Sequence, residues 1–150
     1  MRTIFILLFS FLTTGLFAQT INWADLNNKW DCVKVVQVNG KDSVDTKQFL
    51  PSTNIYSADM NYKEEFPESH ITTFGKYKID KTNNKISFID LVSTATFKYG
   101  KNPQPDYVYN SGRETLIVVK LNSQALVLLQ KGKSNTEVPF DLVFFYKRSK

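Results

Sequence analysis

Hydrophobic and polar residues alternate with a period of two along most of this chain, which is the pattern of half-buried β-strands. Beyond residue 28, the apolar positions are rich in valine, isoleucine, threonine and aromatic residues, and turn-forming residues separate one run from the next. One short segment, 21–27 (INWADLN), could form a helical turn. The pattern predicts eight strands, at residues 29–38, 54–60, 72–80, 85–91, 94–99, 114–121, 124–130 and 138–148.

Two connections between these runs are tight enough to be hairpin turns. Residues 81–84 (KTNN) and 122–123 (NS) contain asparagine, which tolerates the positive φ angles of short hairpins. Successive strands are therefore expected to be antiparallel neighbours. They could form a sandwich or an up-and-down barrel, and the barrel is favoured because closure removes exposed edges. The predicted fold class is all-β: an eight-stranded antiparallel up-and-down barrel with a short N-terminal helical turn.

Closure of an even number of strands makes the first and last strands neighbours, and the first strand then begins where the last one ends. We therefore expect Trp30, near the start of the first strand, to lie beside Arg148 in the closing sequence FFYKR. A guanidinium group over an indole face is a favourable pair. Trp30 and Arg148 would together plug one end of the barrel as a structural pair.

The same up-and-down order assigns each connection to an end of the barrel. The Trp30 end is expected to receive 61–71, the link after Leu91, and 122–123, whereas the opposite end receives the longer set. Long loops on a rigid scaffold often carry binding or catalytic residues. The opposite end therefore reads as the open mouth, and the tyrosine-containing loop 100–113 is the best lid candidate. The connections expected there are 39–53, 81–84, 100–113 and 131–137.

The first residues have the layout of a secretory signal peptide, with Arg2 before an apolar run at 4–12 and Ala18 at the expected cleavage point. The run is short for a bilayer span, which needs about 20 residues, so an uncleaved anchor is the less favoured alternative. We expect residues 1–18 to be removed and residues 19–150 to form one exported domain, in the periplasm or outside the cell. A single cysteine leaves this domain without an internal disulfide.

Residues that could support catalysis, metal binding or nucleic-acid binding are few and dispersed along the chain. The formal net charge is +5, but the basic residues form no block, so a nucleic-acid partner is not expected. His70 stands alone, and Cys32 has the inward parity of Trp30, which predicts a buried and inert thiol. The neighbouring Glu64 and Glu65 are expected to be a solvated surface pair. We therefore expect no enzyme activity, no metal site and no cofactor.

Asn28-Lys29-Trp30, after a short helical segment, resembles the start of the lipocalin-like domains of exported bacterial proteins. In lipocalins a glycine-x-tryptophan motif opens the first strand, and a basic residue near the end of the last strand packs across the tryptophan. Arg148 matches that residue, and Asn28 replaces the glycine. The similarity continues as a pattern through FGKYKID, NNKISFID, LIVVKL and LVLLQ. It implies a barrel that binds a small, mostly apolar molecule in its interior.

Alternation from Trp30 and back from Arg148 predicts inward residues on the first and last strands, and further cavity candidates are chosen on the other strands and in the lid loop 100–113. Lys34 is the informative case, because a lysine in the interior could meet a ligand carboxylate, whereas a bulge would turn it outward. The candidate cavity residues are Lys34, Val36, Tyr56, Tyr77, Phe88, Tyr107, Tyr109, Ile117, Val119 and Phe140.

Two alternatives stay open from the sequence alone. The interior could be filled by its own side chains, because small barrels are often packed solid. The protein could also be an envelope structural or protein-interaction module, with the barrel as a scaffold and loops 39–53 and 100–113 as the contact surface for a protein partner.

Overall fold

The structure is a computed structural model that describes residues 21–39, 42–45, 51–95, 98–99, 102–103, 107–110, 115–132 and 140–150. The predicted signal peptide, 1–18, lies outside these ranges, and so do parts of the predicted loops 39–53, 100–113 and 131–137. None of the helical structure within the described ranges has the length and apolar character of a bilayer-crossing helix.

Within these described ranges the secondary structure is almost entirely strand, with one 3-10 turn before the first strand. In chain order the elements are η1 (Trp23–Leu26), β1 (Lys29–Asn39), β2 (Asp42–Asp45), β3 (Thr53–Tyr56), β4 (Asn61–Phe66), β5 (Ile71–Asp80), β6 (Lys85–Ala95), β7 (Lys98–Tyr99), β8 (Asn102–Pro103), β9 (Tyr107–Asn110), β10 (Thr115–Leu121), β11 (Ala125–Gln130) and β12 (Asp141–Arg148).

One antiparallel sheet closes on itself as a ring. Its order is β10-β11-β12-β1-β3-β4-β5-β6-β9, and β10 also pairs with β6. Along β6, Ser93 pairs with Tyr109 of β9 and Ser87 pairs with Thr115 of β10, so β9 and β10 share one register. The circuit through β10 therefore contains eight strands, and the predicted up-and-down barrel is confirmed.

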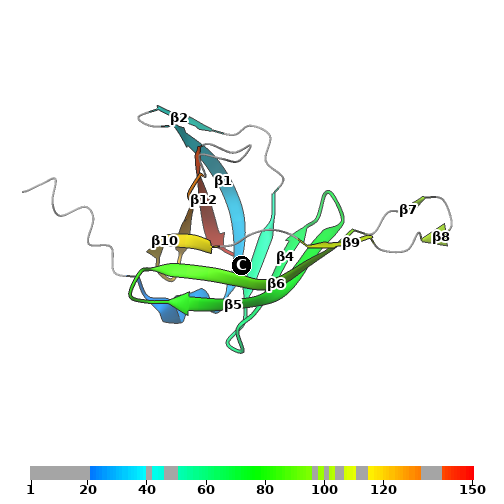
Figure 1. Cartoon of the computed structure of the whole chain (residues 1–150), viewed down its shortest axis with the longest axis horizontal. Helices are drawn as coiled ribbons and strands as arrows, with labels where there is room; N and C mark the ends of the chain where they lie inside the picture. Colours follow the sequence, from blue (N-terminus) through cyan, green and yellow to red (C-terminus); the bar gives the residue numbers. More distant parts are fainter. Residues whose placement is uncertain are drawn as a thin grey trace, which may run out of the picture.

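One end of the barrel is closed by Trp30 and the 3-10 turn. The Trp30 side chain is fully buried, and its Nε1 donates a hydrogen bond to the Leu26 carbonyl oxygen (3.1 Å). Arg148 is the cross-strand partner of Trp30, and its Nη2 donates to Asn28 Oδ1 (2.8 Å). Figure 1 shows η1, in blue, at the same end as the turn between the green strands β5 and β6, whereas β2 stands away from that end.

Strand β4 was not predicted, and its presence reverses two loop assignments. Its sequence, NYKEEF, is rich in charge and reads as a loop. The strand expected at 94–99 is also wrong, because β6 runs unbroken to Ala95. With β4 in the circuit, the turn at 67–70 lies at the end opposite Trp30, and the turn at 81–84 lies at the Trp30 end. Both assignments are the opposite of those expected.

Three irregularities bend the strands and change which residues face inward. The register shifts between Cys32 and Lys34, between Phe74 and Lys76, and between Val118 and Lys120. At the second shift Gly75 lies so close to β6 that a Cβ atom there would be 2.6 Å from Leu91 Cδ2 and 2.9 Å from the Ile89 carbonyl oxygen. Glycine is therefore required for this close approach.

Candidate functional site

Four aromatic side chains fill the barrel interior near its closed end, and we call them the aromatic cluster: Tyr56, Tyr62, Tyr77 and Phe88. The centroid of the Tyr56 ring lies 5.2 Å from the ring centroids of both Tyr62 and Tyr77, and the centroids of the Tyr62 and Phe88 rings are 4.6 Å apart. Three of the four, Tyr56, Tyr77 and Phe88, are predicted cavity residues. They are buried against one another as core side chains.

The Tyr77 hydroxyl ties this cluster to the closed end. It lies within hydrogen-bond distance of the Ser57 carbonyl oxygen (2.8 Å) and of Asn27 Oδ1 (3.0 Å). Burial, and secondarily the negative charge of Asp59, raise the pKa of Tyr77 above its ordinary value of 10.0. The phenol is therefore held in its neutral, hydrogen-bonding form.

Toward the open end, four buried polar residues lie directly opposite one another on four neighbouring strands. Asn54 of β3 pairs with Glu64 of β4, Glu64 pairs with Thr73 of β5, and Thr73 pairs with Ser93 of β6. All four are nearly or fully buried, and Glu64 is only 2% exposed. We call these four residues the polar row. Side chains directly opposite on antiparallel strands have Cβ atoms about 4.5–5.5 Å apart, so the row is continuous.

Hydrogen bonds within the interior satisfy part of the polar row. The hydroxyl oxygens of Thr73 and Ser93 are 2.7 Å apart, and Asn54 Nδ2 donates to the Tyr146 hydroxyl (3.2 Å). Asn54 Oδ1, by contrast, is buried and meets no donor among the described residues. A buried acceptor without a donor costs about 1–3 kcal/mol, so packing alone does not explain its presence.

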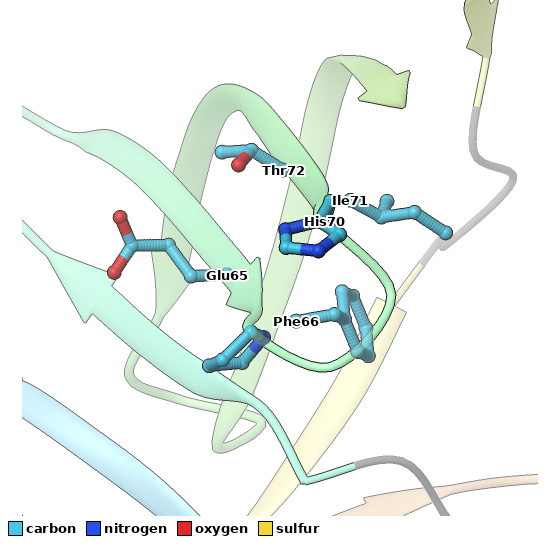
Figure 2. Close-up of a pocket in the computed structure, with 6 residues that line it drawn as sticks. Glu65, Phe66, His70, Ile71 and Thr72 are labelled. Atoms are coloured by element: carbon cyan, nitrogen blue, oxygen red, sulfur yellow. The ribbon is translucent and has the colours of Figure 1, made fainter. Parts of the chain in front are cut away.

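A hollow lies at the rim of the barrel, beside the open side of the polar row. Its volume is about 380 Å³. Figure 2 shows His70 in the middle of this rim hollow, between Glu65 and Thr72 on one side and Phe66 and Ile71 on the other. Phe66 pairs with Ile71 two residues beyond the Glu64–Thr73 pair, whereas Glu65 pairs with Thr72 on the outward face, so the hollow lies at the rim and shares no lining residue with the row. The lining residues are Glu65, Phe66, Pro67, His70, Ile71 and Thr72.

Lys34 does not face the interior. The extra residue at the first register shift turns it outward, where it is exposed and forms an ion pair with Asp45 of β2 (Nζ to Oδ1, 2.9 Å). The outward-turning bulge is therefore the correct alternative. Val36 shares the face of Lys34 and is only half buried, whereas the buried position is Val35. The same bulge makes the expected inward orientation of Val36 wrong, and it leaves Lys34 out of the set of cavity residues.

The expected orientation of Ile117 and Val119 is also wrong. In β10 the buried side chains are Leu116 and Val118, so Ile117 lies on the other face and is half buried. Val119 is the extra residue at the third register shift and is 49% exposed. Neither side chain is placed to line the interior.

The remaining predicted cavity residues lie at the open end. Phe140 is half buried directly before β12, with its backbone against Gly132. Tyr107 and Tyr109 lie in β9, where they pair with Ala95 and Ser93 of β6. Tyr109 thus continues the polar row by register, although its side chain lies outside the described part of the structure.

The polar row is the feature that sequence reasoning missed. Glu64 and Glu65 were expected to be a solvated pair, but only Glu65 reaches solvent, where its Oε1 is 2.6 Å from Lys63 Nζ. Glu64 faces the interior instead. The alternation of Tyr62, Glu64 and Phe66 within NYKEEF was the available signal, and the charges of the intervening residues obscured it.

A second hollow, of about 600 Å³, lies outside the closed end, between η1 and the β5–β6 turn. It is lined by both apolar and basic side chains, among them Trp23, Ile79 and Lys81. Among the described residues, no group of three or more histidine, cysteine or acidic side chains is arranged to hold a metal ion. The polar row is therefore the strongest candidate site in the described part of the chain.

No protein-family model matches this sequence, and a search of curated proteins found no match. The resemblance to lipocalin-like domains stays a prediction from the residues, and any function must be argued from the barrel itself.

Proposed function

We propose that this protein binds a small molecule in the open half of its barrel, with the ligand lying against the polar row. The observation that carries the proposal is the row itself, a continuous set of buried polar side chains on four neighbouring strands. Ligand sites are mostly apolar concavities with a few precisely placed polar groups. A polar row inside an otherwise apolar barrel has that composition.

The surroundings of the row fit a ligand with a polar head and an apolar body. The aromatic cluster borders the row on its closed side, and Phe66 and Ile71 border it on its open side. The rim hollow, at about 380 Å³, falls within the range of about 300–1,000 Å³ typical of ligand pockets. The ligand would reach the row from this rim.

Two expectations from the sequence complete the proposal. The chain is an exported, lipocalin-like barrel, and its ligand is small and mostly apolar, as the resemblance around Trp30 implies. The signal-peptide layout of residues 1–18 supports export. The polar row adds the requirement that part of the ligand forms hydrogen bonds.

The proposal is tested with an uncharged fluorescent probe, N-phenyl-1-naphthylamine, titrated into the protein. We expect saturable binding with one probe per chain and enhanced probe fluorescence. Ser93→Leu places an apolar side chain in the polar row and should abolish binding. Ser87→Leu makes the same change on the outward face of the same strand, where the Ser87 hydroxyl forms a hydrogen bond with that of Thr115. This control variant should leave probe binding intact.

Two results would count against ligand binding. One is the absence of saturable probe binding by the wild-type protein. The other is equal binding by both leucine variants, provided that their circular dichroism spectra match that of the wild type. Native mass spectrometry of protein purified from its own host gives an independent reading, because a bound molecule would add a discrete mass that denaturation removes.

A further inference from the structure

We infer that the closed end of the barrel docks on an anionic phospholipid membrane, through the hollow between η1 and the β5–β6 turn. The inference does not depend on the proposed function, because it concerns the outer surface at the end opposite the open half. It follows from the apolar and basic side chains that line this hollow and from the charges around it.

The apolar part of the hollow comes from three segments that meet at the closed end. Trp23 belongs to η1, Met60 to the turn between β3 and β4, and Ile79 to the end of β5. Trp23 and Ile79 are partly buried against the core. Tryptophan is enriched where proteins meet the lipid–water interface, because its ring is apolar and its N–H group is polar.

Met60 is not explained by the turn in which it lies. Its backbone φ of 63° is in the left-handed region, which favours glycine and asparagine over a long side chain. The side chain is nevertheless 43% exposed and lines the hollow. A membrane interface would cover this apolar surface.

The basic part of the hollow consists of Lys78 and Lys81, which are both exposed. Neither forms an ion pair, and no acidic residue of the described ranges lines the hollow. Lysines elsewhere on the barrel are paired with carboxylates: Lys34 with Asp45, Lys63 with Glu65, and Lys131 with Asp141. Unpaired ammonium groups beside apolar side chains are complementary to anionic head groups above an acyl layer.

Further exposed lysines lie around the closed end, at the start of β1, on β5, after the β5–β6 turn and near the end of the chain: Lys29, Lys76, Lys85, Lys147 and Lys150. The aspartates at this end are fewer, and each accepts a hydrogen bond from a neighbouring asparagine side chain: Asp25, Asp59 and Asp80. The closed end therefore carries an excess of positive charge, which attracts an anionic surface over about one Debye length, about 8–10 Å.

A membrane fits this arrangement better than an acidic protein segment does. The contributing side chains lie on η1 and near two turns, and the Tyr77 backbone N–H and hydroxyl bind one of those turns through the Met60 and Ser57 carbonyl oxygens. A broad surface can contact all of them at once. Docked in this way, the barrel would direct its open end away from the membrane.

Binding to vesicles of phosphatidylglycerol, which is anionic, and of phosphatidylcholine, which is not, tests the inference by co-sedimentation. We expect binding to phosphatidylglycerol to be at least about tenfold tighter, and to weaken as salt is raised. An apolar segment at the N-terminus would bind the two lipids alike, so the difference between them reports on charge. Equal binding to both lipids, or binding to neither, would overturn the inference.

Tryptophan fluorescence shows which end touches the lipid. The chain has two tryptophans, and Trp30 is fully buried, so a change in emission on vesicle binding reports on Trp23. We expect the emission to shift to shorter wavelength with phosphatidylglycerol vesicles. Vesicle-bound protein with unchanged emission would contradict docking through the hollow.

Paired variants separate the hollow from net charge. Lys78→Gln with Lys81→Gln should weaken phosphatidylglycerol binding by about tenfold or more. Lys34→Gln with Lys131→Gln removes the same charge elsewhere on the barrel and should change binding by less than about threefold. Equal losses in the two double variants would overturn the role of the hollow.

Met60→Asn suits the left-handed backbone and removes the apolar side chain, so it should keep the fold and weaken vesicle binding. Binding as tight as that of the wild type would contradict the apolar contact. Soluble poly-L-glutamate represents the acidic-protein alternative, and it should bind more weakly than the vesicles at equal charge concentration. Tighter binding of poly-L-glutamate would overturn the membrane in favour of an acidic partner.

Discussion

The two halves of this barrel bury different chemistry. Near the closed end, Trp30 and the aromatic cluster fill the interior, and both Trp30 Nε1 and the Tyr77 hydroxyl reach acceptors on or beside η1. From Asn54, which lies opposite Trp30, toward the open end, the same sheet buries an amide, a carboxylate and two hydroxyls in one row. The closed half has the composition of a stabilising core, whereas the open half carries polar groups that such a core does not need.

Removing the Trp30 side chain, which closes one end of the barrel, should produce the largest loss of stability. In Trp30→Ala the closed half loses a fully buried indole, and we expect the free energy of unfolding to fall by about 3–5 kcal/mol. Urea denaturation followed by far-ultraviolet circular dichroism measures this change. The control is Val33→Ala on the same strand, where Val33 is 46% exposed and the expected change is within about 0.5 kcal/mol. Similar losses in the two variants would contradict the structural role of the plug.

Removing one hydroxyl from the closed half should have an intermediate effect that depends on pH. Tyr77→Phe leaves the Ser57 carbonyl and Asn27 without this donor, which should cost about 1–2 kcal/mol. The pKa of Tyr77 is raised in the folded state, so its contribution is present below the unfolded value of about 10 and is lost as the pH rises through the folded value.

The gap in stability between wild type and Tyr77→Phe should therefore narrow above about pH 10. Urea denaturation at a series of alkaline pH values measures the gap directly. A gap that stays constant across that range would show that Tyr77 does not titrate as its burial predicts.

Within the polar row, the loss in free energy of unfolding should be smallest when both partners of a hydrogen bond are replaced together. Thr73→Val alone leaves the Ser93 hydroxyl without its partner and should cost about 1–2 kcal/mol. The double variant Thr73→Val with Ser93→Ala should return to within about 1 kcal/mol of the wild type. A double variant whose cost equals the sum of the single costs would show that the hydroxyl pair contributes to stability as the closed half does.

Much of the fold could be predicted from the sequence because it follows from strand periodicity and closure. The pairing of the first and last strands around Trp30 required only an even number of antiparallel strands. The missing strand, β4, could not be recognised in the same way, since Lys63, Glu64 and Glu65 give it the composition of a loop.

The candidate site was less predictable because it depends on register. Glu64 is buried only because Asn54 and Thr73 lie opposite it on strands that are separate in sequence. Bulges add a second difficulty. One extra residue turned Lys34 outward, and another did the same to Val119, and neither bulge has a sequence signal that fixes its position.

The most direct test of the difference between the two halves is a methyl-resolved nuclear magnetic resonance titration with octanol, an uncharged probe. Thr73 and Ile71 report on the open half, and the fully buried Leu26 and Leu121 report on the closed half. Binding in the open half predicts that the methyl signals of Thr73 and Ile71 shift with saturation, while those of Leu26 and Leu121 stay in place. Shifts at Leu26 and Leu121 with Thr73 and Ile71 unchanged would contradict that account.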